Sequence, residues 1–379
     1  MYKRQVPPCF YPSYADAFST WLYRALTFLV VSCPCALVVS VPLSFFGGIG
    51  GASRKGILIK GGNYMDALAH IDTVVLDKTG TLTQGTFAVE AIHPDSLSEK
   101  ELLHLAAHVE HFSHHPIAVA LQGAYQHVGD GCTTNHVHEV VGKGIVADVN
   151  GHRVAVGNER MMEAEGATLH PCKRCEGHAG TVVHVAIDGR YAGHVVISDQ
   201  VKADASEALR ALRQLGVKQT VMLTGDKEAV ARQVAQQVGI DSYAAELLPA
   251  DKVDRVERLI QQQSQEKGTL AFVGDGINDA PVLARADVGI AMGAMGSDAA
   301  IDAADVVLMD DKPSKIAEAI RIARRTIANA RQNVIFAIVV KALVLFLASV
   351  GVATMGMAVF ADVGVMVLCV LNSMRTLRV

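Results

Sequence analysis

The chain has 379 residues, which is enough for more than one domain with a core of its own. Its formal net charge of −4 excludes the strongly basic surface that binds a phosphate backbone, so we expect no nucleic-acid partner. The mean hydropathy of +0.28 is high for a soluble protein, and the apolar excess lies at the two ends of the sequence. The composition therefore predicts membrane segments on either side of a water-soluble middle.

Apolar runs at 22–46, 334–350 and 354–371 are long enough to cross a bilayer as helices. Basic residues flank all of these runs on the same side, which predicts by the positive-inside rule that the middle of the chain is cytoplasmic. A buried helical hairpin at the C-terminus is the alternative, but core helices seldom contain so few polar residues. We expect an integral protein of a bacterial inner membrane, in contact with the lipid bilayer.

A Cys33-Pro34-Cys35 sequence lies inside the first apolar run. Pro34 lacks an N–H group and clashes with the preceding turn, so the helix is expected to kink or unwind there. Both sulfurs can then turn toward one ion, and thiolates select soft cations. The alternative is two small apolar side chains beside a kink. The seven cysteines of the chain are scattered and do not form a disulfide framework.

Short β-branched runs alternate with helix-like sequence in the middle of the chain. The runs are Thr73–Leu76, Thr220–Leu223 and Leu270–Val273, and a polar loop follows each. This alternation predicts a doubly wound parallel sheet whose ligands lie at the carboxyl ends of the strands. A histidine- and glycine-rich segment between about 83 and 195 interrupts the pattern, and we expect it to be an inserted second domain.

The loops after these strands contain groups suited to phosphoryl transfer. An exposed aspartate at the end of a strand can accept a γ-phosphoryl group as an acyl phosphate, while hydroxyl, N–H and lysine groups hold its oxygens. The residues expected to do this are Asp77, Lys78, Thr79, Thr224, Gly225, Asp226 and Lys252. Hard oxygen ligands suit Mg²⁺. The expected magnesium ligands are Asp77, Thr79, Asp275 and Asp279.

Each of these motifs alone would be an ordinary turn, but their order along the chain is specific. The segment 77–83, Asp-Lys-Thr-Gly-Thr-Leu-Thr, resembles the signature of the P-type ATPases within the haloacid-dehalogenase superfamily, and the Cys-Pro-Cys sequence resembles the heavy-metal branch. The resemblance implies a multidomain α/β protein with a haloacid-dehalogenase-like parallel sheet, an inserted α+β nucleotide-binding domain and three transmembrane helices. The expected divisions are a truncated N-terminal region with one membrane helix at 1–65, a phosphorylation domain at 66–88 and 196–325, a nucleotide-binding domain at 89–195, and two membrane helices at 326–379.

The inserted segment resembles the nucleotide-binding domain of the same branch, which implies that it binds ATP. The residues implied are Glu110, His115, Gly142, Gly144, Gly157 and Asn158. Four histidines, His104, His108, His111 and His115, also fall on one face of a predicted helix, as either a metal-binding stripe or a partly solvated face. A second group lies outside the family pattern and is either a zinc site or an unligated loop. Its members are His170, Cys172, Cys175 and His178.

Ionisable residues stand inside the last two apolar runs, where each costs roughly 3 kcal/mol if unpaired. Lys341 and Asp362 resemble the pair found in the zinc, cadmium and lead subgroup rather than the copper subgroup. We expect Cys33, Cys35 and Asp362 to bind the transported cation, and Lys341 to pair with Asp362 when the site is empty.

The resemblance implies ATP-driven export of Zn²⁺, Cd²⁺ or Pb²⁺ through an aspartyl phosphate at Asp77. Thr79 stands where phosphatases of this fold carry an acid/base aspartate, which implies an intermediate that persists. The sequence contains no Thr-Gly-Glu, so we expect a C-terminal fragment that lacks the actuator domain and cannot complete the cycle alone. The alternatives are a membrane-anchored phosphatase of the same superfamily, a copper-transporting member, and a non-catalytic metal-binding membrane protein.

Overall fold

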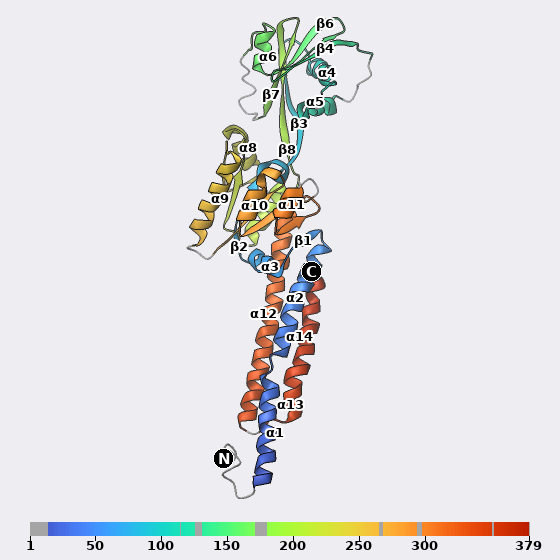
Figure 1. Cartoon of the computed structure of the whole chain (residues 1–379). Coiled ribbons are helices and arrows are strands. Elements are labelled where there is room, and N and C mark those ends of the chain that lie inside the picture. Colours follow the sequence, from blue (N-terminus) through green and yellow to red (C-terminus); the bar gives the residue numbers. More distant parts are fainter. Residues whose placement is uncertain are drawn as a thin grey trace.

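The computed structural model describes residues 14–113, 115–125, 131–170, 180–264, 268–293, 298–350 and 352–378. Figure 1 shows an elongated molecule, with a bundle of long helices at one end, a parallel-sheet domain in the middle and an antiparallel-sheet domain at the other end. The two sheets have seven and six strands within the described residues. The expected combination of a parallel sheet with an inserted domain is therefore confirmed.

The parallel-sheet domain is built from the β-branched runs expected to form strands. In spatial order its strands are β1 (Ile57–Ile59), β13 (Val306–Leu308), β12 (Val288–Met292), β11 (Thr269–Gly274), β2 (Ile71–Asp77), β9 (Gln219–Leu223) and β10 (Ser242–Ala244). Only β1 is antiparallel to its neighbour among these pairs. The strands β2, β9 and β11 are adjacent, so the loops after them meet at one edge of the sheet.

Helices cover both faces of this sheet, which explains why its strands are almost continuously apolar. In β2, Val74 and Leu76 face one core and Val75 faces the other. The first core contains residues of α3 (Gly62–Ala69), α7 (Ala205–Gln214), α8 (Glu228–Val238) and α12 (Ser314–Ser349). The second contains residues of α9 (Pro249–Ser264), α10 (Ala280–Arg285) and α11 (Asp298–Ala303).

The antiparallel-sheet domain is inserted between the long strands β3 and β8, which connect it to the parallel sheet (Figure 1). Its strands, in spatial order, are β3 (Thr83–Pro94), β8 (Arg190–Val201), β7 (Thr181–Ile187), β6 (His152–Gly157), β5 (Gly144–Val149) and β4 (Thr134–Val140). Apolar residues of α4 (Glu99–Glu110) and α5 (Pro116–Ala124) pack on one face, and the short α6 (Glu159–Ala164) packs on the other.

The helical bundle contains three candidate membrane spans among the described residues: Phe18–Ser53, Ser314–Ser349 and Met355–Arg378. The first is broken into α1 (Tyr14–Ser32) and α2 (Cys35–Ser53), as expected around Pro34. The last comprises α13 (Met355–Val359), a π-turn at Phe360–Gly364, α14 (Val365–Ser373) and a 3₁₀ turn at Met374–Arg378. The run expected from 334 is the second half of α12, a 36-residue helix that begins against the parallel sheet.

Candidate functional site

The loop that follows β2 presents Asp77 at the carboxyl edge of the parallel sheet. Asp77 is the last residue of the strand and is 6% exposed, and a tight π-turn at Lys78–Leu82 follows it. Within this turn Gly80 has a φ of +70°, and a Cβ added there would lie 1.6 Å from Oδ2 of Asp275. The turn therefore requires glycine both for its backbone conformation and for the close approach of the β11 loop.

Asp77, Asp275 and Asp279 form what we call the aspartate cluster, with one carboxylate oxygen of each within 4.8 Å of the others. Nζ of Lys252, from α9, donates to Asp77 Oδ1 at 2.5 Å and to Asp279 Oδ1 at 3.0 Å. Burial and the Asp279 charge raise the pKa of Asp77 to about 7, and burial and the same charge raise the pKa of Asp275 to about 6. One lysine thus leaves these carboxylates under-neutralised, so the donor set fits a hard divalent cation such as Mg²⁺.

The other phosphoryl-transfer residues expected from the sequence lie beside the aspartate cluster. Lys78 forms an ion pair with Asp226 at 2.5 Å. Thr224 is 2% exposed, and its Oγ1 accepts a hydrogen bond from the Asp226 N–H at 3.1 Å, which shapes the loop after β9. Thr79 is exposed at the surface of the loop, and its role as a magnesium ligand stays a prediction.

Sequence reasoning missed two charged residues that hold this loop in place. Asp199, on β8, lies 3.6 Å from Lys78 and accepts a hydrogen bond from the Thr83 hydroxyl. Lys202 donates to the Gly80 carbonyl and forms a 3.0 Å ion pair with Asp311. Lys202 is buried and the Asp199 side chain is only 4% exposed where β8 returns to the parallel sheet. In the sequence they appear only as charges shortly after the apolar run 195–197.

A cleft of about 980 Å³ lies between the two sheet domains and opens beside the turn at Lys78–Leu82. Its lining includes Lys78, Thr79 and Asp226 from the parallel-sheet side, and Asn158 and Arg160 from the antiparallel-sheet side. Polar residues from both domains therefore surround a space that reaches Lys78 and Thr79, which directly follow Asp77. The lining residues from the antiparallel sheet do not include Glu110 or His115.

The glycines expected near the nucleotide come together at one turn of the antiparallel sheet. Gly144 pairs with Gly157 between β5 and β6, and a Cβ on Gly144 would lie 2.1 Å from the Val156 carbonyl oxygen. The Asn158 side chain donates to the Gly142 carbonyl at 2.9 Å and caps α6 by accepting from the Met161 N–H. These contacts bring four of the six expected nucleotide residues to one place.

Glu110 and His115 lie at the α4–α5 connection. Glu110 ends α4 and is 6% exposed, and burial together with the Glu139 charge raises its pKa to about 7. His115 is exposed, and its Nδ1 accepts a hydrogen bond from the Ile117 N–H at the start of α5. Their roles in binding a nucleotide stay predictions.

The expected single histidine stripe is wrong. The helix α4 ends at Glu110, His111 lies in the following turn, and His115 caps the next helix. The residue before a proline is disfavoured in a helix, so Pro116 requires a new helix to begin there. His104 and His108 stay together on α4. In the second expected group, Cys172, Cys175 and His178 lie outside the described residues, and His170 is 3.4 Å from Asp95.

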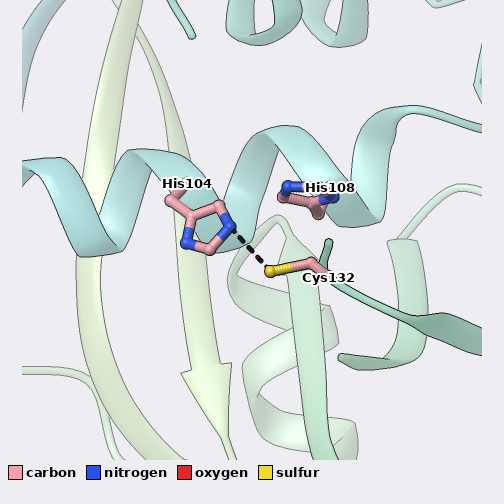
Figure 2. A group of neighbouring side chains, drawn as sticks. All are labelled: His104, His108 and Cys132. Carbon is pink, nitrogen blue, oxygen red and sulfur yellow. Dashed lines mark hydrogen bonds between the residues drawn. The ribbon is translucent and has the colours of Figure 1, made fainter. Parts of the chain in front are cut away.

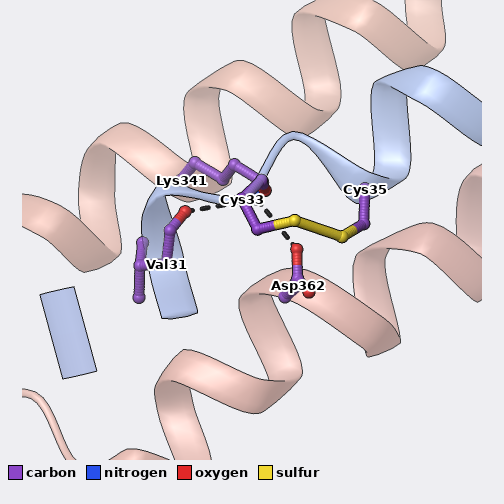
Figure 3. Close-up of a disulfide and its surroundings, with 5 residues drawn as sticks. All are labelled: Val31, Cys33, Cys35, Lys341 and Asp362. Atoms are coloured by element: carbon purple, nitrogen blue, oxygen red, sulfur yellow. Dashed lines mark hydrogen bonds and ion pairs between the residues drawn. A yellow bond between two sulfur atoms is a disulfide. The ribbon is translucent and has the colours of Figure 1, made fainter. Parts of the chain in front are cut away.

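Inside the bundle, the break between α1 and α2 brings Cys33, Cys35 and Asp362 together, and we call this group the membrane cluster (Figure 3). One ligand atom of each lies within 4.8 Å of the others. The two sulfurs are joined as a disulfide in the structure. Thiolates rather than a disulfide bind a metal ion, so this cluster would bind a cation in its reduced form.

Lys341, on α12, contacts the membrane cluster from the opposite side. Its Nζ lies 3.0 Å from Asp362 Oδ1 and also donates to the carbonyl oxygens of Val31 and Cys33, which the helix break frees (Figure 3). Asp362 stands in a π-turn, an irregularity that the sequence did not reveal. The side chains of Lys341 and Asp362 are largely buried, so each charge is neutralised by the other and not by surrounding water.

Known proteins similar to this chain include a hydrolase family and several metal-transporting ATPases. Residues 71–287 match the family model of haloacid dehalogenase-like hydrolases. The chain is 53% identical over 98% of its length to a zinc-transporting ATPase of Synechocystis sp., and 53% identical over 96% to a cadmium, zinc and cobalt-transporting ATPase of Bacillus subtilis. It spans about half the length of these relatives. A crystal structure of a zinc-transporting PIB-type ATPase in the E2.Pi state superimposes with a TM-score of 0.87 at 39% identity, covering 99% of this chain and 60% of that one.

Proposed function

Because the chain belongs to the haloacid dehalogenase-like hydrolases and, within them, to the metal-transporting P-type ATPases, we propose a transport function for the full-length protein. It would export a soft divalent cation, driven by the hydrolysis of ATP. The family expected from the order of the motifs is confirmed. The observation that carries the proposal is the presence in one chain of the aspartate cluster at the sheet edge and of Cys33 and Cys35, at a helix break, beside Asp362. A single helix, α12, contacts both regions.

In the proposed reaction, a carboxylate oxygen of Asp77 forms a bond to the γ-phosphorus of ATP while the bond to the β-phosphate oxygen breaks and ADP leaves. Lys252 is placed to hold the Asp77 carboxylate, and Lys78 and the loop after β9 lie where they could hold the phosphoryl oxygens. Bound Mg²⁺, held by the aspartate cluster, would neutralise charge on the phosphates. Thr79 stands where an acid/base aspartate would speed hydrolysis, which favours a persistent intermediate over a phosphatase.

ATP would enter the cleft between the sheet domains. We propose that Asn158, Gly142, Gly144 and Gly157 hold part of the nucleotide. The backbones of Gly144 and Gly157 approach closely, the Asn158 side chain contacts the Gly142 carbonyl, and Asn158 lines the cleft. His115 and Glu110 are proposed to act at the adenine end, at the α4–α5 connection. Neither His115 nor Glu110 lines the cleft. The two domains would therefore have to move about β3 and β8 for these residues and Asp77 to contact opposite ends of one ATP molecule.

We propose Zn²⁺ or Cd²⁺ as the cation, since the membrane cluster combines two sulfur ligands with one carboxylate. The carboxylate of Asp362 adds a hard, charged ligand, which favours a divalent cation over singly charged copper. The proposed location is a bacterial membrane, with both sheet domains in the cytoplasm, as the basic flanks of the spans indicate. Lead, included in the sequence-based expectation, is a further soft cation to test.

The test is phosphorylation of the full-length gene product by γ-labelled ATP with Mg²⁺. We expect an acid-stable, hydroxylamine-labile label that disappears in Asp77→Asn. The matched control is Asp66→Asn, because Asp66 is exposed on α3, outside the aspartate cluster. Labelling that survives in Asp77→Asn would assign the phosphoryl acceptor elsewhere and remove the basis of the proposal.

A further inference from the structure

A second group of soft ligands lies in the antiparallel-sheet domain, far from the membrane cluster. His104, His108 and Cys132 each place one ligand atom within 4.8 Å of the other two (Figure 2). His104 and His108 are one turn apart on α4, so their rings lie on the same face of the helix. Cys132 comes from the segment before β4 and approaches that face from the side.

The distances in this group suit a tetrahedral metal ion. His104 Nε2 and Cys132 Sγ lie 3.2 Å apart, and the two imidazole rings are 4.6 Å apart and nearly perpendicular. Zinc–nitrogen and zinc–sulfur bonds of about 2.0 and 2.3 Å separate two tetrahedral ligands by about 3.6 Å. Small side-chain rotations would therefore bring the three atoms to bonding distance, with a fourth position left open.

Neighbouring residues orient two of the ligands. The Tyr125 ring stacks on His104 with centroids 5.1 Å apart, which limits rotation of that imidazole. Asn150 accepts a hydrogen bond from the Thr133 N–H through Oδ1, so its side-chain N–H group points at Cys132 Sγ, 3.1 Å away. A donor at this position stabilises the thiolate, which is the form of cysteine that binds metal.

The group is also accessible, because His104 and Cys132 are half-buried while His108 is buried. A metal ion could enter from the solvent side and meet the two half-buried ligands before the buried one. Two imidazoles and one thiolate form a ligand set that favours Zn²⁺, Cd²⁺ or Co²⁺ over Mg²⁺ or Ca²⁺.

We propose that His104, His108 and Cys132 form a binding site for a soft or borderline divalent cation in the antiparallel-sheet domain, separate from the membrane cluster and made by none of the residues expected to bind the nucleotide. Its occupancy joins the middle of α4 to the segment before β4. The site does not depend on transport, because its ligands all come from the domain that is proposed to bind the nucleotide.

The test is titration with Co²⁺ of the reduced, metal-free chain in detergent. The background variant replaces Cys33, Cys35, Cys172 and Cys175 with serine, so that the membrane cluster and the other paired thiols do not contribute. We expect a thiolate-to-cobalt charge-transfer band that Zn²⁺ abolishes by competition. Adding Cys132→Ser should remove the band, and adding His104→Gln should weaken Co²⁺ binding roughly tenfold or more.

The matched control is His111→Gln in the same background, because His111 is an exposed histidine just beyond the same helix. It should leave the titration unchanged, and far-UV circular dichroism should show equal helix content in all variants. A band that survives Cys132→Ser, equal effects of His104→Gln and His111→Gln, or no band in the background would each overturn the proposal.

Discussion

The aspartate cluster and the membrane cluster have a similar arrangement of charges, one at the edge of a sheet and the other in the helical bundle. Each brings together anionic side chains from separate elements. In each, a helix contributes a lysine that contacts a carboxylate: Lys252 contacts Asp77, and Lys341 contacts Asp362. The first lies at the edge of a sheet and has only oxygen ligands, whereas the second lies at a helix break and has two sulfurs. The ligand chemistry therefore distinguishes the proposed Mg²⁺ site from the proposed soft-cation site, although the charge arrangement is similar.

The lysines differ in what they contact. Lys252 bridges the carboxylates of Asp77 and Asp279. A cation could therefore bind Asp275 and the remaining carboxylate oxygens without displacing the lysine. Lys341 contacts Asp362 and two backbone carbonyls, so its ammonium group occupies space beside a ligand that the cation needs. We infer that Lys252 assists the ion at its site, while Lys341 competes with it.

The helix α12 connects the two regions physically. Its first turns, including Ile316 and Ile320, pack in the core below the parallel sheet, and Lys341 lies farther along the same helix. At 1.5 Å per residue, Ile320 and Lys341 are roughly 30 Å apart along the axis. A shift of the sheet domain on phosphorylation would therefore move Lys341 relative to Asp362 if α12 moves as a rigid rod.

The largest expected effect separates the two partners of the membrane ion pair. In full-length protein, Asp362→Ala should abolish Zn²⁺-stimulated ATP turnover and lower the amount of bound metal, because a ligand is lost. Lys341→Ala should keep metal binding but impair release or selectivity, since the competing charge is gone. Metal-stimulated turnover and equilibrium metal binding, measured on both variants, test this.

Two results would contradict the roles given to Asp362 and Lys341. Full Zn²⁺ transport by Asp362→Ala would show that the carboxylate is not a ligand. Loss of metal binding in Lys341→Ala would show that the lysine shapes the site instead of emptying it, which would make its role similar to that of Lys252. The conservative variant Lys341→Arg keeps the charge, and we expect it to resemble the parent protein more closely than Lys341→Ala does.

The sequence predicted three of the parallel strands and placed Asp77, Asp275 and Asp279 at or just after their carboxyl ends, because short motifs directly after apolar runs report on the edge of a parallel sheet. It also predicted that Lys341 and Asp362 pair, because two opposite charges in apolar helices have few other partners. Contacts made across long sequence distances were harder to foresee. The group of His104, His108 and Cys132 depends on a cysteine 24 residues beyond His108 whose position only the tertiary fold determines.

Buried charges from β8 were missed for the same reason. Asp199 and Lys202 resemble ordinary strand-end charges in the sequence, and only the return of β8 to the parallel sheet places them against the phosphorylation loop. The histidine stripe failed because helical periodicity was extended across a His-Pro step, where the chain begins a new helix.

A smaller effect is expected when Lys252 is removed from the aspartate cluster. In Lys252→Met, the Asp77 carboxylate loses the ion pair that lowers its pKa, so the pKa should rise further and less of the nucleophile should be ionised near neutral pH. Loss of one preorganised cation typically slows such a step by about 10²–10³-fold. Rapid-quench measurement of phosphoenzyme formation should show this, together with a shift of the pH–rate profile to higher pH.

The control for this variant is Lys218→Met, which removes a lysine paired with Asp72 near the opposite end of β2. It should leave the phosphorylation rate and its pH profile unchanged. An unshifted profile in Lys252→Met would show that the lysine does not set the ionisation of Asp77, and the similarity between the two clusters would then be one of geometry alone.

The smallest effect concerns Glu110, a carboxylate that the structure buries beside Glu139 instead of beside a lysine. Its pKa is raised to about 7 in the folded chain, by burial first and by Glu139 second, from a usual value of 4.5. The protonated form is therefore favoured by folding, and its contribution to stability is present below pH 4.5 and is lost as the pH rises through about 7. Glu110→Gln should remove this loss and stabilise the antiparallel-sheet domain at pH 8 by on the order of 1–3 kcal/mol.

Hydrogen exchange of the α4 amides between pH 5 and 8, corrected for intrinsic exchange rates, measures that stability within the intact chain. Glu139→Gln is the matched variant, because it removes only the second cause and leaves the burial of Glu110 in place. The pKa of Glu110 should fall partway toward 4.5, so the loss of stability should be smaller and should be complete at a lower pH than in the parent chain. A domain whose stability does not change with pH in the parent chain would show that Glu110 stays ionised. The chain would then tolerate a buried, ionised carboxylate with no lysine beside it. Lys252 and Lys341 would in that case act on the bound cation and would not be needed to neutralise buried carboxylates.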